Sequence, residues 1–364
     1  MAEYPENEAK LTKISAKKIL DEIQNGKPYK PVVHDRVIVT GDLDANELDL
    51  PTKRVERSAD VLREYEKNIS KKCKVVSAPI KITNSVFCGK VKLCNIIFEG
   101  SIDFENTTFS SDAYFIGAIF GRDAKFIGDA FNGHANFNGT KFMDVSFERA
   151  IFSFYAVWGY AKFNRDVNFE GTKFQGDFVS FGKADFVFPK SEEDACRRAK
   201  SVMAKAGNRY FEEDFFYREM VAKRKQKSFL NNLHGKHNTL KAETLTILDQ
   251  IRRIIMYDIA ENILFQKIFG YGVRPWNVIG SWLLFVLVIF PFVYWMADGM
   301  NEGLRDRYIG DSFILAVAPG YIATIINGTA EHTSTYRFVA YAEIIMGAFL
   351  WACLIATFIK RYMR

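Results

Sequence analysis

The sequence has few cysteines and none of the spacings that usually bind metal or build a disulfide framework. Among its 364 residues there are five cysteines, and no two of them form a Cys-x-x-Cys pair. The odd number and the wide spacing exclude a disulfide scaffold and a cysteine-based zinc site, and they fit a reducing compartment. The first ten residues are polar and contain no apolar core, so the sequence predicts no secretory signal peptide.

The motifs of enzymes are lacking as well. No segment contains a Ser/His/Asp or paired-carboxylate arrangement, and no glycine-rich loop has a phosphate-binding pattern. His234 and His237 are three residues apart, but no neighbouring cysteine or carboxylate completes a metal site. The sequence therefore predicts no catalytic residues, no metal and no cofactor, and we expect that the chain is not an enzyme.

Phenylalanine, in contrast, is abundant and periodic. The chain has 33 Phe against five Trp and nine Met. From Phe87 to Phe174 large apolar residues recur at steps that mostly alternate between five and six, and an alanine or threonine often stands two positions before the ring. These steps match neither the helical period of 3.6 nor the strand period of 2. They predict a solenoid in which each short side contributes one ring to a central stack.

The stretch AKFIGDAFNGHANFNGTKF, Ala124–Phe142, resembles the pentapeptide-repeat family in its Phe-centred form. The resemblance implies a right-handed quadrilateral β-helix with four sides per coil. Sides of five and six residues then give about 22 residues per coil and about 4.5 coils from Phe87 to Phe186, a stack roughly 20 Å long. We assign residues 31–188 to this β-helix, with Val37–Pro51 and Ile80–Ser85 as irregular first coils.

Both the start and the surface of the solenoid can be predicted. Ser15 is placed to N-cap a short helix that ends at Gly26, so residues 1–30 form a capping element over the open end of the stack. The surface charge between Ser85 and Phe188 is nearly balanced, which argues against an acidic mimic of DNA, and no nucleic-acid partner is expected. A rigid scaffold, or a docking surface for a cytosolic protein, is the prediction.

Residues 189–272 contain helix-forming sequence and are predicted to form a cytosolic connector. Ser191 and Asp194 have the spacing of a capping box, and Gly207 separates a first helix from a second. The second helix carries a basic cluster, Lys223–Lys227, with two open interpretations. It is either a solvated helix end or a contact with anionic lipid head groups.

The last quarter of the chain contains two apolar runs long enough to cross a bilayer. Val278–Met296 has no charged residue, and Phe338–Ile359 has only Glu343. Ser312–Ile326 between them is apolar but too short to cross, which indicates a re-entrant segment. Basic residues before the first run and after the second place both ends in the cytosol by the positive-inside rule. The sequence thus predicts a multi-pass protein of the cell membrane with N-terminus, C-terminus and β-helix in the cytoplasm.

The membrane domain is assigned to residues 273–364, with spans at about 276–297 and 337–361 and a re-entrant segment at about 309–332.

The last sixty residues resemble the potassium-channel pore family. Asp311–Phe313 is similar to the start of its pore helix, and Arg337, Glu343 and Gly347 have the Arg, Glu and Gly spacing of its inner helix. The resemblance implies a homotetrameric pore in which Gly347 is the gating hinge, and in which Glu343 and Arg337 have structural roles behind the filter. It also implies inner-cavity candidates, which are Phe349, Cys353 and Thr357.

The filter departs from that family. A potassium filter needs Thr-Val-Gly-Tyr-Gly, because backbone carbonyls must replace the hydration shell of the ion. Counting back from Arg337 places Tyr321–Ile326 at the filter, without a glycine, whereas counting from Gly320 keeps one Gly-Tyr pair. Neither alignment supplies the second glycine, so potassium selectivity does not carry over and the permeant ion is unknown. The candidates for the constriction are Gly320, Tyr321, Thr324, Asn327, Gly328 and Glu331.

Two functions fit these features. The first is an oligomeric ion channel whose cytosolic β-helix serves gating or docking. The alternative is a membrane-anchored pentapeptide-repeat scaffold that conducts nothing, in which the spans only tether the solenoid. The lipid bilayer is a partner in both.

Overall fold

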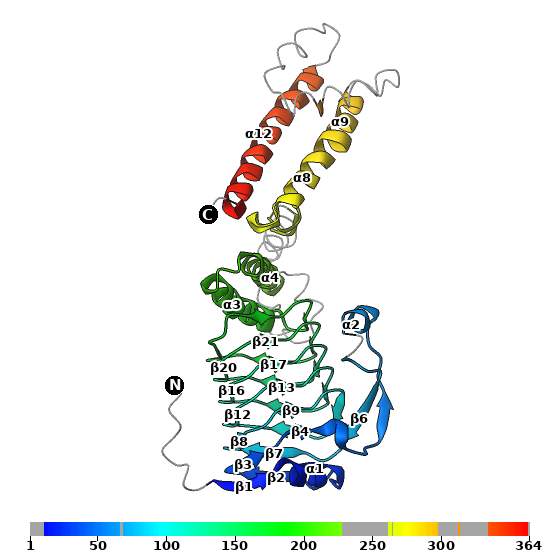
Figure 1. The fold of residues 1–364 in the computed structure, drawn as a ribbon. Helices are drawn as coiled ribbons and strands as arrows, with labels where there is room; N and C mark the ends of the chain where they lie inside the picture. The colour runs from blue at the N-terminus through cyan, green and yellow to red at the C-terminus, as the bar shows by residue number, and fades with distance from the viewer. Residues whose placement is uncertain are drawn as a thin grey trace, which may run out of the picture. The chain divides into compact units, whose positions relative to one another are not determined.

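The computed structural model describes residues 11–65, 68–227, 261–263, 265–297, 312–313 and 334–362 (Figure 1). The chain forms two compact units, Met1–Lys223 and Arg224–Arg364, and each is described by itself. The predicted domain boundaries at residues 30, 188 and 272 stay predictions.

The first unit is a β-helix-like solenoid of short strands in four sheets. The first sheet contains β1 (Thr12–Ser15), β3 (Val37–Thr40), β8 (Val86–Phe87), β12 (Thr108–Phe109), β16 (Ala130–Phe131), β20 (Ile151–Phe152) and β24 (Lys173–Phe174). The second sheet contains β5 (Thr52–Arg54), β6 (Lys72–Val76), β10 (Ile96–Phe98), β14 (Ile119–Phe120), β18 (Lys141–Phe142), β22 (Lys162–Phe163) and β26 (Asp185–Phe186). The third sheet contains β2 (Val32–Asp35), β7 (Ile80–Thr83), β11 (Ile102–Asp103), β15 (Ala124–Lys125), β19 (Val145–Ser146) and β23 (Val167–Asn168). The fourth sheet contains β4 (Leu43–Asp44), β9 (Val91–Lys92), β13 (Ala113–Tyr114), β17 (Ala135–Asn136), β21 (Ala156–Val157) and β25 (Val179–Ser180).

The register confirms the coil length expected from the repeat. Phe109 pairs with Phe131, 22 residues later, and Phe131 pairs with Phe152, 21 residues later. Successive strands therefore join successive sheets, and each strand meets its neighbours one coil away. Every described ladder is parallel except β5–β6, which is antiparallel.

The predicted ring stack forms the core. Rings one coil apart lie parallel, as in Phe115 and Phe137, whose centroids are 4.8 Å apart with planes 2° from parallel. Rings on neighbouring sides meet edge to face, as in Phe126 and Phe137 at 5.6 Å and 78°. Both geometries are favourable for aromatic quadrupoles. Small residues such as Ala118 are fully buried beside the rings, because the tight corner has room for little more than a methyl group.

One position breaks this pattern of small residues. Asp129 replaces the usual alanine or threonine and is completely buried. Its Oδ1 accepts a hydrogen bond from the Thr107 backbone N–H at 2.8 Å, and its Oδ2 has no partner. Burial raises the pKa of the Asp129 carboxyl well above its usual range, because ionisation would place an uncompensated charge inside the coil.

The helices at the two ends of the solenoid close the stack (Figure 1). α1 (Ala16–Gln24) begins after Ser15, whose Oγ accepts a hydrogen bond from the Lys18 N–H at 3.3 Å, as the sequence predicts. α1 buries Ile19, Leu20 and Ile23 in the same core cluster as the rings. At the other end, α3 (Pro189–Lys205) and α4 (Arg209–Lys227) follow the last coil.

The predicted capping box is wrong. α3 begins one turn earlier than the Ser191 box requires, with Phe188 as the N-cap and Pro189 in the first turn, where proline is well tolerated. Ser191 therefore lies inside the helix, and its hydroxyl donates to Asp166 Oδ1 at 2.9 Å.

In the basic cluster of α4, Lys223 pairs with Glu219 and Arg224 donates to Gln266 Oε1 at 3.0 Å. These two side chains have partners within the protein, and both interpretations of the cluster stay predictions.

An excursion between the first coils was not expected from the sequence. After η2 (Ala45–Glu47) the chain leaves the stack, forms α2 (Ala59–Glu64) and returns through β6 (Figure 1). Arg57 of this excursion donates to the backbone carbonyls of Gly139 and Gly117, several coils further along the solenoid. The excursion thus runs along one side of the stack.

The second unit contains two helices long and apolar enough to cross a membrane, at Pro275–Met296 and Phe338–Ile359. The first is continuous through α8 (Pro275–Leu284), the π-helical turn η5 (Phe285–Ile289) and α9 (Phe290–Ala297), and it follows the turn η4 (Gly270–Gly272). The second lies within α12 (Ser334–Tyr362).

Candidate functional site

A buried polar cluster connects the two apolar helices. Glu343 lies in the first half of the apolar helix α12 and is only 1% exposed. Its Oε2 accepts a hydrogen bond from the hydroxyl of Tyr294 on α9, and its Oε1 contacts the hydroxyl of Ser312, both at 2.5 Å. A buried carboxyl group without such partners costs several kcal/mol in apolar surroundings, so these hydrogen bonds explain how Glu343 is accommodated between the two helices.

The π turn explains why Ser312 belongs to the cluster. In a π-helix each carbonyl accepts from the N–H five residues later, and the Phe290 N–H indeed donates to the Phe285 carbonyl. The next carbonyl, that of Val286, then faces the nitrogen of Pro291, which carries no hydrogen. The Ser312 hydroxyl lies 2.7 Å from the Val286 carbonyl oxygen and can fill this vacant acceptor.

The number of protons sets the chemistry of the cluster. The three contacts, from Tyr294 to Glu343, between Glu343 and Ser312, and from Ser312 to Val286, need three protons. The two hydroxyl groups supply one each. The Ser312 hydroxyl has one proton, so at any moment it donates either to Glu343 Oε1 or to the Val286 carbonyl oxygen.

The inner-helix candidates all lie on α12. Gly347 and Thr357 are buried on the same side as Glu343, and the Thr357 hydroxyl donates to the Cys353 carbonyl at 2.7 Å. Phe349, Cys353 and Thr357 follow one another at steps of four residues and therefore lie along one side of the helix. Phe349 is 54% exposed within the single chain and Cys353 is half-buried, and the roles of all three as cavity residues stay predictions.

The other residues predicted from the sequence lie at the start of α12 or outside the described residues. Arg337 lies in the first turn of α12. The six constriction candidates, which are Gly320, Tyr321, Thr324, Asn327, Gly328 and Glu331, lie outside the described residues, as do His234 and His237. Within the described ranges there is no group of three His, Cys, Asp or Glu side chains that could hold a metal ion.

Sequence reasoning singled out Glu343 but missed its partners. Tyr294 was hidden within a run of aromatic residues, and Ser312 was noted only as the start of a pore helix. The signal that could have found Ser312 is the proline at position 291, which leaves a carbonyl of the first span without a backbone donor.

Comparison of the chain with protein-family models, with curated proteins and with solved structures found no match.

Proposed function

We propose that the chain is the subunit of an ion channel. In this proposal the second unit forms a homotetrameric pore in the cell membrane. The first unit is a right-handed quadrilateral β-helix of the pentapeptide-repeat type that lies in the cytoplasm and serves gating or docking. The permeant ion is left open, because the filter candidates lack the second glycine of a potassium filter.

The observation that carries the proposal is the polar cluster of Glu343, Tyr294 and Ser312. Two helices that only tether a soluble domain need no buried carboxyl group between them, because apolar packing is sufficient and cheaper. A cluster that connects both spans to the start of the intervening segment supports a unit that holds a re-entrant segment in a defined place. The many exposed apolar side chains of α12, such as Ile345 and Trp351, fit contact with lipid or with further subunits.

The experiment measures the mass of the purified full-length particle in detergent and its conductance in planar bilayers. We expect a particle of four chains with discrete current steps. A particle of one or two chains without current for any ion tested would instead favour the anchored scaffold.

Two variants at position 343 test the role of the cluster. In Glu343→Gln the amide N–H₂ donates to Ser312 Oγ and the amide oxygen accepts from Tyr294, so we expect assembly and current to persist. Glu343→Ala loses two hydrogen bonds worth about 1–2 kcal/mol each, and we expect the tetramer to dissociate more readily and the current to fall. Equal behaviour of the two variants would show that the polar cluster does not support the pore.

A further inference from the structure

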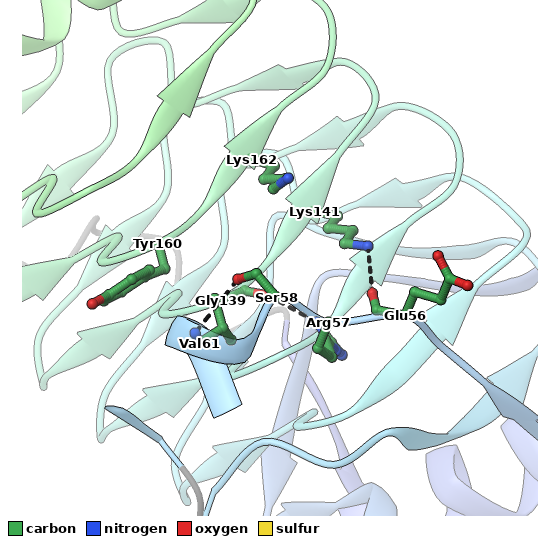
Figure 2. A pocket seen from close by; sticks show the side chains of 8 residues that line it. All are labelled: Glu56, Arg57, Ser58, Val61, Gly139, Lys141, Tyr160 and Lys162. Carbon is green, nitrogen blue, oxygen red and sulfur yellow. Dashed lines mark hydrogen bonds between the residues drawn. The ribbon is translucent and has the colours of Figure 1, made fainter. Parts of the chain in front are cut away.

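A cavity of about 340 Å³ lies between the excursion and the side of the solenoid (Figure 2). Its volume is at the lower end of the range of small-molecule sites. One wall is the start of the excursion and the other is the outer surface of β18, β22 and the adjoining turns. The lining residues are Glu56, Arg57, Ser58, Val61, Gly139, Lys141, Tyr160 and Lys162.

Two lysines stand next to each other on this wall. Lys141 and Lys162 are register partners on β18 and β22, and Figure 2 shows their side chains extending from the same face of the sheet. Like charges directly opposite each other on neighbouring strands are destabilising. Burial lowers the pKa of Lys141, and the positive charges of Arg57 and Lys162 lower it further, which shows that the electrostatic environment of this ammonium group is unfavourable.

Among the described residues no carboxylate forms an ion pair with either lysine. The Lys141 ammonium donates to the backbone carbonyl of Glu56 at 3.1 Å, and the negative charge of Glu56 offsets only part of the effect of Arg57 and Lys162 on the pKa of Lys141. Lys162 has no side-chain hydrogen bond or ion pair among the described residues, and Asp185, its register partner on β26, does not pair with it.

Several lysines of the solenoid pair with a carboxylate on a neighbouring coil. Lys81 pairs with Asp103 at 3.5 Å, and Lys90 pairs with Asp112 at 3.3 Å. The two lysines of the cavity differ from these, because they are next to each other and neither forms an ion pair among the described residues.

The excursion adds one further positive charge and one further donor. Arg57 is held in place by the carbonyls of Gly139 and Gly117, and its Nε is buried, so this side chain contributes charge rather than a direct contact. Ser58 accepts a hydrogen bond from the Val61 N–H as the cap of α2, so its hydroxyl proton remains available to donate.

We propose that this cavity binds a small phosphate monoester, with Lys141 and Lys162 as the cationic ligands, Ser58 as a hydrogen-bond donor and Arg57 as a further positive charge beside them. A dianionic phosphate group neutralises two ammonium groups and presents enough acceptor oxygens for all of these donors, which a single carboxylate does not. The phosphate monoester is either a soluble metabolite or the head group of a lipid, since both present the same chemistry to the cavity.

The test titrates the full-length protein in detergent with glycerol 3-phosphate in one arm and with dioctanoyl phosphatidylinositol 4-phosphate in the other, by calorimetry and by thermal unfolding. We expect saturable binding in at least one arm and a rise in unfolding temperature with ligand concentration. Binding in the first arm identifies a soluble ligand, and binding in the second arm alone identifies a lipid head group.

The variants use the repeat itself for a matched control. Lys162→Gln should weaken binding at least tenfold. Without ligand it should unfold at a higher temperature than the wild-type protein, because the repulsion is removed. Lys173→Gln changes the lysine at the same repeat position on β24, in a different sheet, and should leave binding unchanged.

The absence of binding in both arms would overturn the proposal. So would a Lys162→Gln protein that binds as tightly as the wild type, or a Lys173→Gln protein that loses as much affinity, because the effect would then come from the overall surface charge.

Discussion

Replacement of Asp129 by asparagine should remove a pH dependence from the stability of the solenoid. The carboxyl group is completely buried, accepts one hydrogen bond from the Thr107 N–H and has a second oxygen without a partner. Burial raises its pKa in the folded chain, whereas in the unfolded chain the pKa returns to about 3.9. Folding therefore changes the proton affinity of this residue.

The sign and the size of the effect follow from proton counting. Above pH 4 the unfolded chain releases the proton of Asp129 while the folded chain keeps it. The free energy of unfolding then falls by about 1.4 kcal/mol for each pH unit, from about pH 4 up to the pKa in the folded chain. The stabilisation is thus fully present below pH 4 and is lost as the pH rises.

Other carboxyl groups do not obscure this window. Hydrogen bonds from Asn84 and Thr83 lower the pKa of Asp35, so its contribution is present above its unfolded pKa and is lost as the pH falls below it. Above about pH 5.5 such a group is ionised in both the folded and the unfolded chain, and it adds no slope. The slope of Asp129 is therefore measured from pH 5.5 upward, as the difference between the wild type and Asp129→Asn.

The assay follows urea unfolding of residues 1–227 by tryptophan fluorescence. This fragment contains one tryptophan, Trp158, which is fully buried in the ring stack. In Asp129→Asn the amide oxygen still accepts from the Thr107 N–H. The amide nitrogen takes the place of the unpaired oxygen, at a cost of about 1–3 kcal/mol that does not change with pH. We expect a falling free energy of unfolding for the wild type and a flat one for the variant.

The control is Asp123→Asn, which makes the same chemical change at an exposed position and should keep the slope of the wild type. A wild-type curve as flat as that of Asp129→Asn would refute the reasoning, because the buried carboxyl group would then have no unusual proton affinity.

Two further predictions concern the ring stack and the excursion, and both are measured as free energies of unfolding in urea. Phe126→Ala should cost about 3–5 kcal/mol, because the fully buried ring contacts six others, whereas Phe154→Ala at an exposed ring should change stability by about 0.5 kcal/mol or less. Equal costs would show that the rings do not carry the stack. Gly139→Ala should cost more than the roughly 1–2 kcal/mol expected of Gly207→Ala: both glycines have a positive φ, but a Cβ at 139 would lie 2.4 Å from Ile69 Cδ1, while one at 207 meets nothing within 4 Å. A smaller loss at 139 than at 207 would show that the excursion is not packed against the solenoid.

The solenoid was predictable because its information is local. Each side of five or six residues contributes one ring, and the register of Phe109 with Phe131 follows from counting along the chain. The two apolar helices were predictable for a similar reason, since hydropathy over about twenty residues needs no knowledge of what they touch.

The misses are all contacts between residues far apart in sequence. Arg57 reaches Gly139, 82 positions away, and no periodicity indicates that the excursion returns to that side of the stack. The neighbours of Ser191 predict a helix cap at this residue, but the helix begins earlier because Pro189 is well tolerated in its first turn. The hydroxyl of Ser191 instead donates to Asp166, 25 positions away. Asp129 stands two positions before Phe131, where the repeat usually has an alanine or threonine, but the pattern does not show that its carboxyl group has one buried oxygen without a partner.

What the sequence by itself determined is therefore the kind of unit and its order: a capped Phe stack, two connecting helices and two apolar spans separated by a shorter apolar segment. Only the tertiary structure decided which polar groups are buried together. The pairing of Glu343 with Tyr294, 49 positions away, and the cavity that encloses Lys141 and Lys162 under the excursion depend on distances in space. The physical reason is that repeats and hydropathy are properties of short segments, whereas the cost of burying a charge depends on every group that surrounds it.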